Sequence, residues 1–129
     1  MFEPKGQPAM DSLIGATTRV DGNLLFRGGM RIDGQVVGDV AAEAGHASYL
    51  VIAEHARVEG AVRCDHLVVN GEIKGAVHCA ALLEIQPKGR IIGDVCYKVL
   101  EMHGGAQVFG KLTHHDSSGA EPLLAVSGA

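Results

Sequence analysis

The sequence is poor in aromatic residues, which make up 4% of its 129 residues, and it contains no tryptophan. Hydrophobic residues nevertheless account for 47% of the chain, so a core must consist mainly of Val, Ile, Leu and Ala side chains. A chain of this length normally builds one core rather than two. We therefore expect a single domain, and the 18 glycines are too evenly interleaved with aliphatic residues for a disordered linker.

Runs of basic residues are also missing. Lys and Arg number 11 against 15 Asp and Glu, which gives a formal net charge of −4. Proteins that bind nucleic acid normally present a basic patch to the phosphate backbone. We therefore do not expect nucleic acid among the partners.

No apolar run approaches the ~18 residues that a membrane-spanning helix needs, and the N-terminus has no apolar segment of the secretory type. The three cysteines, Cys64, Cys79 and Cys96, form no CxxC pair and lack zinc-finger spacing. Free thiols in a reducing compartment are the expectation. These features together predict a cytoplasmic protein.

A regular alternation runs through residues 20–40, VDGNLLFRGGMRIDGQVVGDV. Even positions are apolar or glycine, whereas odd positions are mostly polar. Such a period of two predicts extended chain with one buried face. A straight strand of this length would measure about 70 Å, far beyond the usual range, so the chain must bend. We expect Gly22, Gly28 and Gly34, which are spaced six residues apart, to form the corners.

A five-residue unit, aliphatic-x-Gly-x-aliphatic, recurs along the chain. Its central glycines are Gly22, Gly38, Gly60, Gly75, Gly93 and Gly110, at intervals of 16, 22, 15, 18 and 17 residues. A period near seventeen built from strands predicts a β-solenoid, in which each coil stacks on the next. The longest interval contains residues 41–49, AAEAGHASY, which we predict to be an inserted loop.

The expected fold is therefore all-β, a single β-solenoid of about six coils over residues 13–112. Residues 1–12 and 113–129 show no alternation and are expected to be flexible tails. Cys64 and Cys79 each follow a buried valine by two residues in successive coils. This placement predicts a stacked pair of thiols inside the core.

Two apparent ligand sites have simpler explanations. Residues 105–112, GAQVFGKL, approach the phosphate-binding pattern G-x-x-x-x-G-K-[ST], but Leu112 replaces the required hydroxyl and no helical pattern follows. The seven histidines have no spacing that demands a metal; they are His46, His55, His66, His78, His103, His114 and His115. We predict no catalytic residue, no bound metal and no cofactor.

The two open ends of a solenoid are its most distinctive surfaces, since each exposes unpaired backbone groups and the cross-section of the core. Neither tail shows an amphipathic helix to cover them. Apolar residues expected at these ends are Ile14, Val20, Leu24 and Phe26 in the first coil and Val108, Phe109 and Leu112 in the last. End contacts that do not close into a ring produce filaments, so we predict a self-assembling protein.

Several segments resemble the bactofilins over about residues 12–112. They are Leu13-Ile14-Gly15, Val20-Asp21-Gly22-Asn23-Leu24, Arg31-Ile32-Asp33-Gly34, Val69-Asn70-Gly71-Glu72-Ile73-Lys74-Gly75 and Gly89-Arg90-Ile91-Ile92-Gly93-Asp94. The resemblance implies a right-handed β-helix that polymerises without nucleotide into nonpolar cytoskeletal filaments. It also implies association with the bacterial inner membrane and positioning of cell-wall or morphogenesis proteins. Met1 and Phe2, followed by Lys5, are similar to the short membrane-targeting sequence of some members.

The alternative hypothesis is an enzyme of the left-handed hexapeptide-repeat class, such as an acyltransferase or a zinc carbonic anhydrase. Apolar residues recur every six positions, at 14, 20, 26 and 32 and again at 67, 73, 79, 85 and 91. In hexapeptide enzymes the position four residues later is normally small because the corner is tight. Large residues stand at such positions here, namely Leu24, Met30, Val36, Val77 and Val95, which favours the scaffold.

Overall fold

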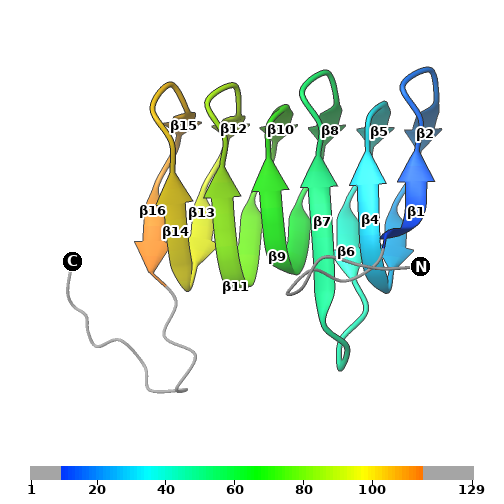
Figure 1. Cartoon of the computed structure of the whole chain (residues 1–129), viewed down its shortest axis with the longest axis horizontal. Helices are drawn as coiled ribbons and strands as arrows, with labels where there is room; N and C mark the ends of the chain where they lie inside the picture. Colours follow the sequence, from blue (N-terminus) through cyan, green and yellow to red (C-terminus); the bar gives the residue numbers. More distant parts are fainter. Residues whose placement is uncertain (1–9, 115–129) are drawn as a thin grey trace, which may run out of the picture.

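The computed structural model describes residues 10–114, which form sixteen β-strands and no helix (Figure 1). The strands wind into six coils that stack in a row, and all paired strands are parallel. Each coil has three sides, so equivalent strands of successive coils build three faces along the stack. Within residues 10–114 no helix is long and apolar enough to cross a membrane. The predicted all-β solenoid of about six coils is confirmed.

Face 1 contains β1 (Met10–Ile14), β4 (Gly28–Ile32), β7 (Ser48–Ile52), the second halves of β9 (Val62–Val69) and β11 (Val77–Ile85), and β14 (Val99–Met102). Face 2 contains β2 (Arg19–Asp21), β5 (Gln35–Val37), β8 (Arg57–Glu59), β10 (Glu72–Lys74), β12 (Arg90–Ile92) and β15 (Gln107–Phe109). Face 3 contains β3 (Leu24–Phe26), β6 (Val40–Ala42), the first halves of β9 and β11, β13 (Val95–Tyr97) and β16 (Leu112–His114).

The core consists of columns of identical or similar aliphatic side chains, one from each coil. On face 2 the register aligns Val20, Val36, Val58, Ile73, Ile91 and Val108 in one inward column. The four middle members of this column are completely buried. In-register parallel pairing keeps inward residues inward in every coil, because side chains alternate strictly along each strand. For this reason the alternation of apolar and polar residues continues across the corners between strands.

The six glycines of the repeat unit also stack in a column, at the corner between faces 2 and 3. Gly60, Gly75 and Gly93 have φ angles of 154°, 153° and 150°, in a region that other residues rarely occupy. A Cβ atom on Gly75 would lie 2.2 Å from the carbonyl oxygen of Gly60 in the preceding coil. The repeat unit therefore reflects close backbone contact between coils.

The predicted corners at Gly22, Gly28 and Gly34 are confirmed. Gly22 lies between β2 and β3, Gly28 begins β4 after the bend, and Gly34 lies between β4 and β5. Gly29 lies in β4, and its backbone amide donates a hydrogen bond to the Asp11 carboxylate. None of these glycines needs a ligand to explain its position.

The insertion is shorter than the predicted 41–49. β6 ends at Ala42 and β7 begins at Ser48, so the connecting loop comprises residues 43–47, and it projects beyond the neighbouring corners (Figure 1). The predicted range included strand residues at both ends. Alanines at 41 and 42 give no contrast between apolar and polar positions, so the alternation could not reveal these strand ends.

The strands extend slightly beyond residues 13–112 at both ends. β1 begins at Met10, and β16 continues to His114. Pairing with β4 on one side and β13 on the other holds these residues in the ladder although the hydrophobic alternation has already stopped. Backbone hydrogen bonds do not depend on side-chain type. The hydrophobic alternation therefore underestimates how many residues at the two ends of the chain segment form strands.

Candidate polymerisation ends

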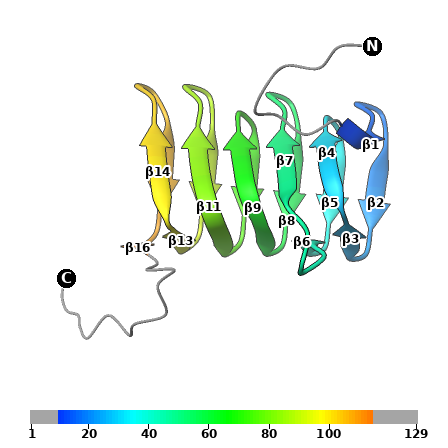
Figure 2. The ribbon, with the colours of Figure 1, turned by 60° about the horizontal axis from the view of Figure 1, so that its bottom comes forward.

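The first and last coils lie at opposite ends of the stack (Figures 1 and 2). The first coil (β1, β2, β3) pairs only with the second, and the last coil (β14, β15, β16) pairs only with the fifth. Each end therefore presents one unpaired edge of backbone N–H and C=O groups on every face. No helix covers either end within the described part of the chain.

At the N-terminal end, three of the predicted residues lie side by side around the first coil. Ile14, Val20 and Leu24 are half-buried and pack against the core. One side of each contacts the second coil, and the other side faces the open end. Phe26 differs, because its side chain is only 6% exposed. It is paired with Ala42 of the second coil and belongs to the buried core of the monomer.

At the C-terminal end, Val108 and Leu112 occupy the last positions of two inward columns. Val108 is half-buried against Ile91, and Leu112 remains 42% exposed next to Val95. Phe109 instead points outward on face 2, where it is 50% exposed and lies under the Arg90 guanidinium at 5.3 Å. Val108 and Leu112 therefore belong to the open cross-section, whereas Phe109 lies on its rim.

Two further residues of the C-terminal end were missed by the sequence analysis. Leu100 and Met102 on β14 continue the inward columns of Leu83 and Ile85, and Met102 is 45% exposed. Both residues occupy alternate, inward positions equivalent to Leu83 and Ile85 in the preceding coil, and this pattern could have identified them. The apolar end surface consequently includes face 1 as well as faces 2 and 3.

Comparison with known proteins agrees with this geometry. Residues 12–113 match the family described as bactofilin, polymer-forming cytoskeletal. The chain belongs to the bactofilin family. The resemblance found in the sequence is confirmed, and the chain is a polymer-forming cytoskeletal protein by family.

One solved structure shows the same fold. It is a cryo-EM reconstruction of Thermus thermophilus bactofilin double helical filaments, with 24% sequence identity and a TM-score of 0.67. The similarity covers 81% of this chain and 99% of the Thermus chain. A comparison with curated proteins finds no match.

The buried thiols of this bactofilin form part of the core. Cys64 and Cys79 are direct neighbours in the ladder and both are buried, which confirms the predicted stacked pair. A hydrogen bond with Cys79, together with burial, raises the pKa of the Cys64 thiol. A raised pKa disfavours the reactive thiolate of Cys64, which is consistent with a packing role for this buried residue.

Cys96 offers the strongest case for the enzyme hypothesis. It lies opposite His78 on the outer side of face 3, along a groove of ≈ 630 Å³ that also contains Ala41 and Thr113. A catalytic cysteine needs a lowered pKa, whereas burial raises the pKa of Cys96. The raised pKa disfavours the thiolate form of Cys96 that a nucleophile requires.

Residues 105–112 include β15, the corner that follows it and the first residue of β16, and do not form a phosphate-binding loop. Gly110 belongs to the stacked glycine column, and the Lys111 amide donates a 3.0 Å hydrogen bond to the Asp94 carboxylate. The chain then enters β16, so no helix N-terminus follows the lysine. The three residues predicted for membrane targeting, Met1, Phe2 and Lys5, lie outside the described residues.

Proposed function

We propose that this bactofilin assembles end to end without nucleotide into nonpolar filaments. The filaments act as a scaffold at the cytoplasmic face of the inner membrane, where they position cell-wall or morphogenesis proteins. The observation that carries the proposal is the pair of coil ends that nothing within residues 10–114 covers, each with an unpaired strand edge and an apolar cross-section. A structural role of this kind requires no catalytic residue and no cofactor.

The ends supply two sources of association energy at once. Burying exposed apolar surface contributes roughly 25 cal/mol per Å², and the exposed parts of Met102 and Leu112 are available for this. Each new backbone hydrogen bond across the joint adds about 1 kcal/mol. Three strand edges of one subunit meet three edges of the next. In a nonpolar filament each joint is symmetric, so the strands that meet across it run antiparallel, unlike the parallel strands within the subunit.

The direct test is electron microscopy of the purified full chain in buffer without nucleotide. We expect unbranched filaments whose long axis follows the stacking direction, and their length should not change when ATP or GTP is added. A homogeneous monomer or trimer at high protein concentration would contradict the proposal. That result would favour the alternative hypothesis of a hexapeptide-repeat enzyme.

Membrane association is proposed to depend on Met1 and Phe2. One short apolar segment binds a bilayer weakly, and Glu3 adds a negative charge, so stable attachment requires many copies along one filament. We expect Phe2→Ser to reduce co-sedimentation with anionic vesicles by about tenfold or more, since avidity multiplies weak single contacts. Leu25→Ser, which removes an exposed leucine of β3, is the matched control and should bind normally. Equal vesicle binding by both variants would contradict this mode of attachment.

A further inference from the structure

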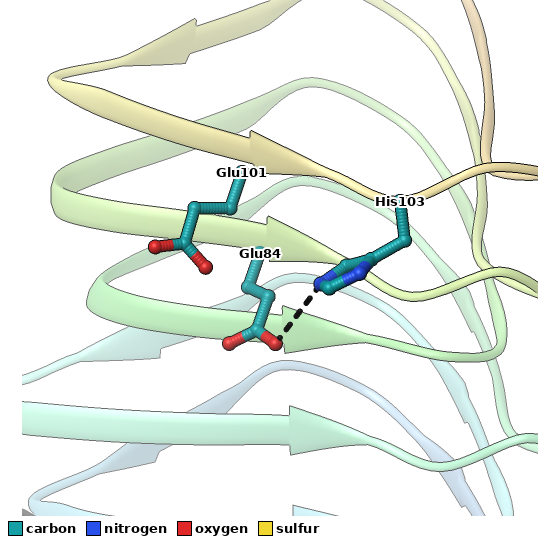
Figure 3. A group of neighbouring side chains, drawn as sticks. All are labelled: Glu84, Glu101 and His103. Atoms are coloured by element: carbon teal, nitrogen blue, oxygen red, sulfur yellow. Dashed lines mark ion pairs between the residues drawn. The ribbon is translucent and has the colours of Figure 1, made fainter.

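Three potential metal ligands gather on the outer side of face 1, where the fifth and sixth coils meet (Figure 3). Glu84 on β11 and Glu101 on β14 are direct neighbours in the ladder. His103 follows Glu101 by two residues and projects from the same side of the chain. The ligand atoms of the three side chains all lie within 4.8 Å of one another.

The spacing of these atoms fits a small coordination sphere. Glu84 Oε2 and His103 Nε2 are 3.4 Å apart. Two ligands of a tetrahedral zinc ion, with bonds of about 2.0–2.1 Å, are separated by about 3.3 Å. This pair therefore already has the separation of two ligands on one ion. Glu101 is exposed, so a rotation of its side chain can bring its carboxylate to the third position.

We propose that Glu84, Glu101 and His103 bind one divalent transition-metal ion, with zinc as the representative metal. Two carboxylates balance the charge of the ion, and the imidazole favours zinc and related metals over magnesium and calcium, which prefer oxygen ligands. Three protein ligands leave a position for a bound water molecule. The sequence analysis found no such site, because Glu84 and Glu101 meet only when neighbouring coils stack.

Two neighbouring side chains support the site. Gln86 Nε2 donates a hydrogen bond to Glu84 Oε2, which holds that carboxylate in place, as groups around a metal commonly do. His66 lies one coil below, and its buried Nε2 atom has no hydrogen-bond partner within the described residues. Burial lowers the pKa of His66, and the charges of Glu84 and Glu101 act in the opposite direction.

The Nε2 atom without a partner belongs to a ring that stands opposite Leu82, two residues before Glu84 on the same outer side of face 1. An isolated buried polar atom costs free energy, and most such atoms find a partner. The site would also connect the last two coils, since Glu84 belongs to the fifth coil whereas Glu101 and His103 belong to the sixth.

Zinc titration of the EDTA-treated full chain by calorimetry tests the proposal. We expect one ion per chain and a rise of the unfolding temperature by about 5 °C or more at saturating zinc, because the ion binds the folded state. His103→Gln and Glu101→Gln should each weaken binding at least tenfold and remove most of this rise. Both residues are exposed, so these variants should fold normally, and circular dichroism verifies that they do.

Two matched controls separate this site from adventitious zinc binding. His55→Gln removes an exposed histidine on a distant corner, and His114→Gln combined with His115→Gln removes two histidines that are adjacent in the sequence. Zinc affinity should be unchanged in both. Undetectable zinc binding, full affinity in His103→Gln, loss of binding only in the double variant, or equal affinity for magnesium would each overturn the proposal. These results do not depend on filament formation, because calorimetry and unfolding also report on single chains.

Discussion

Replacing Val108 by arginine should abolish filament formation while leaving the β-helix folded. Val108 is the last member of the inward column on face 2, and its outer side faces the open end. A charge at this position would have to lose its hydration at the joint, which costs several kcal/mol. We therefore expect the association constant of the C-terminal joint to fall by about 100-fold or more, since each 1.4 kcal/mol is about tenfold. Pelleting and electron microscopy measure the loss of filaments.

Gln107→Arg is the matched control for this variant. Gln107 precedes Val108 on β15, but it is exposed on the outer side of face 2. The same charge is therefore added to the same strand without entering the joint. Filaments of normal length from Gln107→Arg, together with an unchanged far-UV circular dichroism spectrum of Val108→Arg, would locate the effect in the cross-section. Normal filaments from Val108→Arg would show that the contact lies elsewhere.

The oligomeric state of Val108→Arg also distinguishes the two ways of joining the subunits. In a nonpolar filament, joints between two N-terminal ends alternate with joints between two C-terminal ends, and each joint is symmetric. Blocking the C-terminal joint then leaves dimers. In a polar filament every joint uses both ends, so the same variant is a monomer. Our proposal predicts dimers by analytical ultracentrifugation, and Val20→Arg at the opposite end should also give dimers.

Gly75→Ala should destabilise the protein by about 4 kcal/mol or more. The φ angle of 153° alone costs an alanine about 1–3 kcal/mol. In addition, the new Cβ would lie 2.2 Å from the carbonyl oxygen of Gly60, a contact that requires the fourth coil to move away from the third. Folded domains have a total stability of about 5–15 kcal/mol, so this change would remove a large part of it. Denaturant unfolding followed by circular dichroism measures the change.

Two other glycines separate the causes of this loss. Gly22 has a φ angle of 134°, but a Cβ atom added to it would meet nothing within 4 Å, so Gly22→Ala should cost only about 1–3 kcal/mol. Gly104 has neither a positive φ angle nor a close neighbour, and Gly104→Ala should stay within about 0.5 kcal/mol of the parent protein. All three should be compared at one protein concentration, because assembly makes apparent stability depend on concentration. Similar losses in all three variants would contradict the close-contact explanation.

Much of the fold follows from short-range features of the sequence. The period of two predicts strands, the glycine units near every seventeen residues predict coils, and both are confirmed because parallel stacking repeats one local structure. The pairing of Cys64 with Cys79 was predictable for the same reason, since both occupy one place in successive units. The end of β6 was less predictable, because Ala41 and Ala42 fit a strand and a loop equally well.

The ends were predicted less completely than the body of the stack. Parity correctly identified Val108 and Leu112 as inward residues of the last coil. It did not show that Phe26 is already buried within the monomer, because burial depends on packing between coils. Leu100 and Met102 were missed since the register of β14 against β11 could not be read from β14 alone.

The sequence by itself determined the type of structure: an aliphatic solenoid with glycine corners, open ends and a bactofilin resemblance. These properties depend on side-chain alternation and on residues close together in the chain. Only the tertiary structure decided which side chains of different coils meet. It set the register that places Glu84 beside Glu101, covers Phe26 and exposes Met102. The physical reason is that lateral neighbours in a solenoid are about seventeen residues apart and the corners differ in length, so local alternation alone does not fix which residues of two coils are paired.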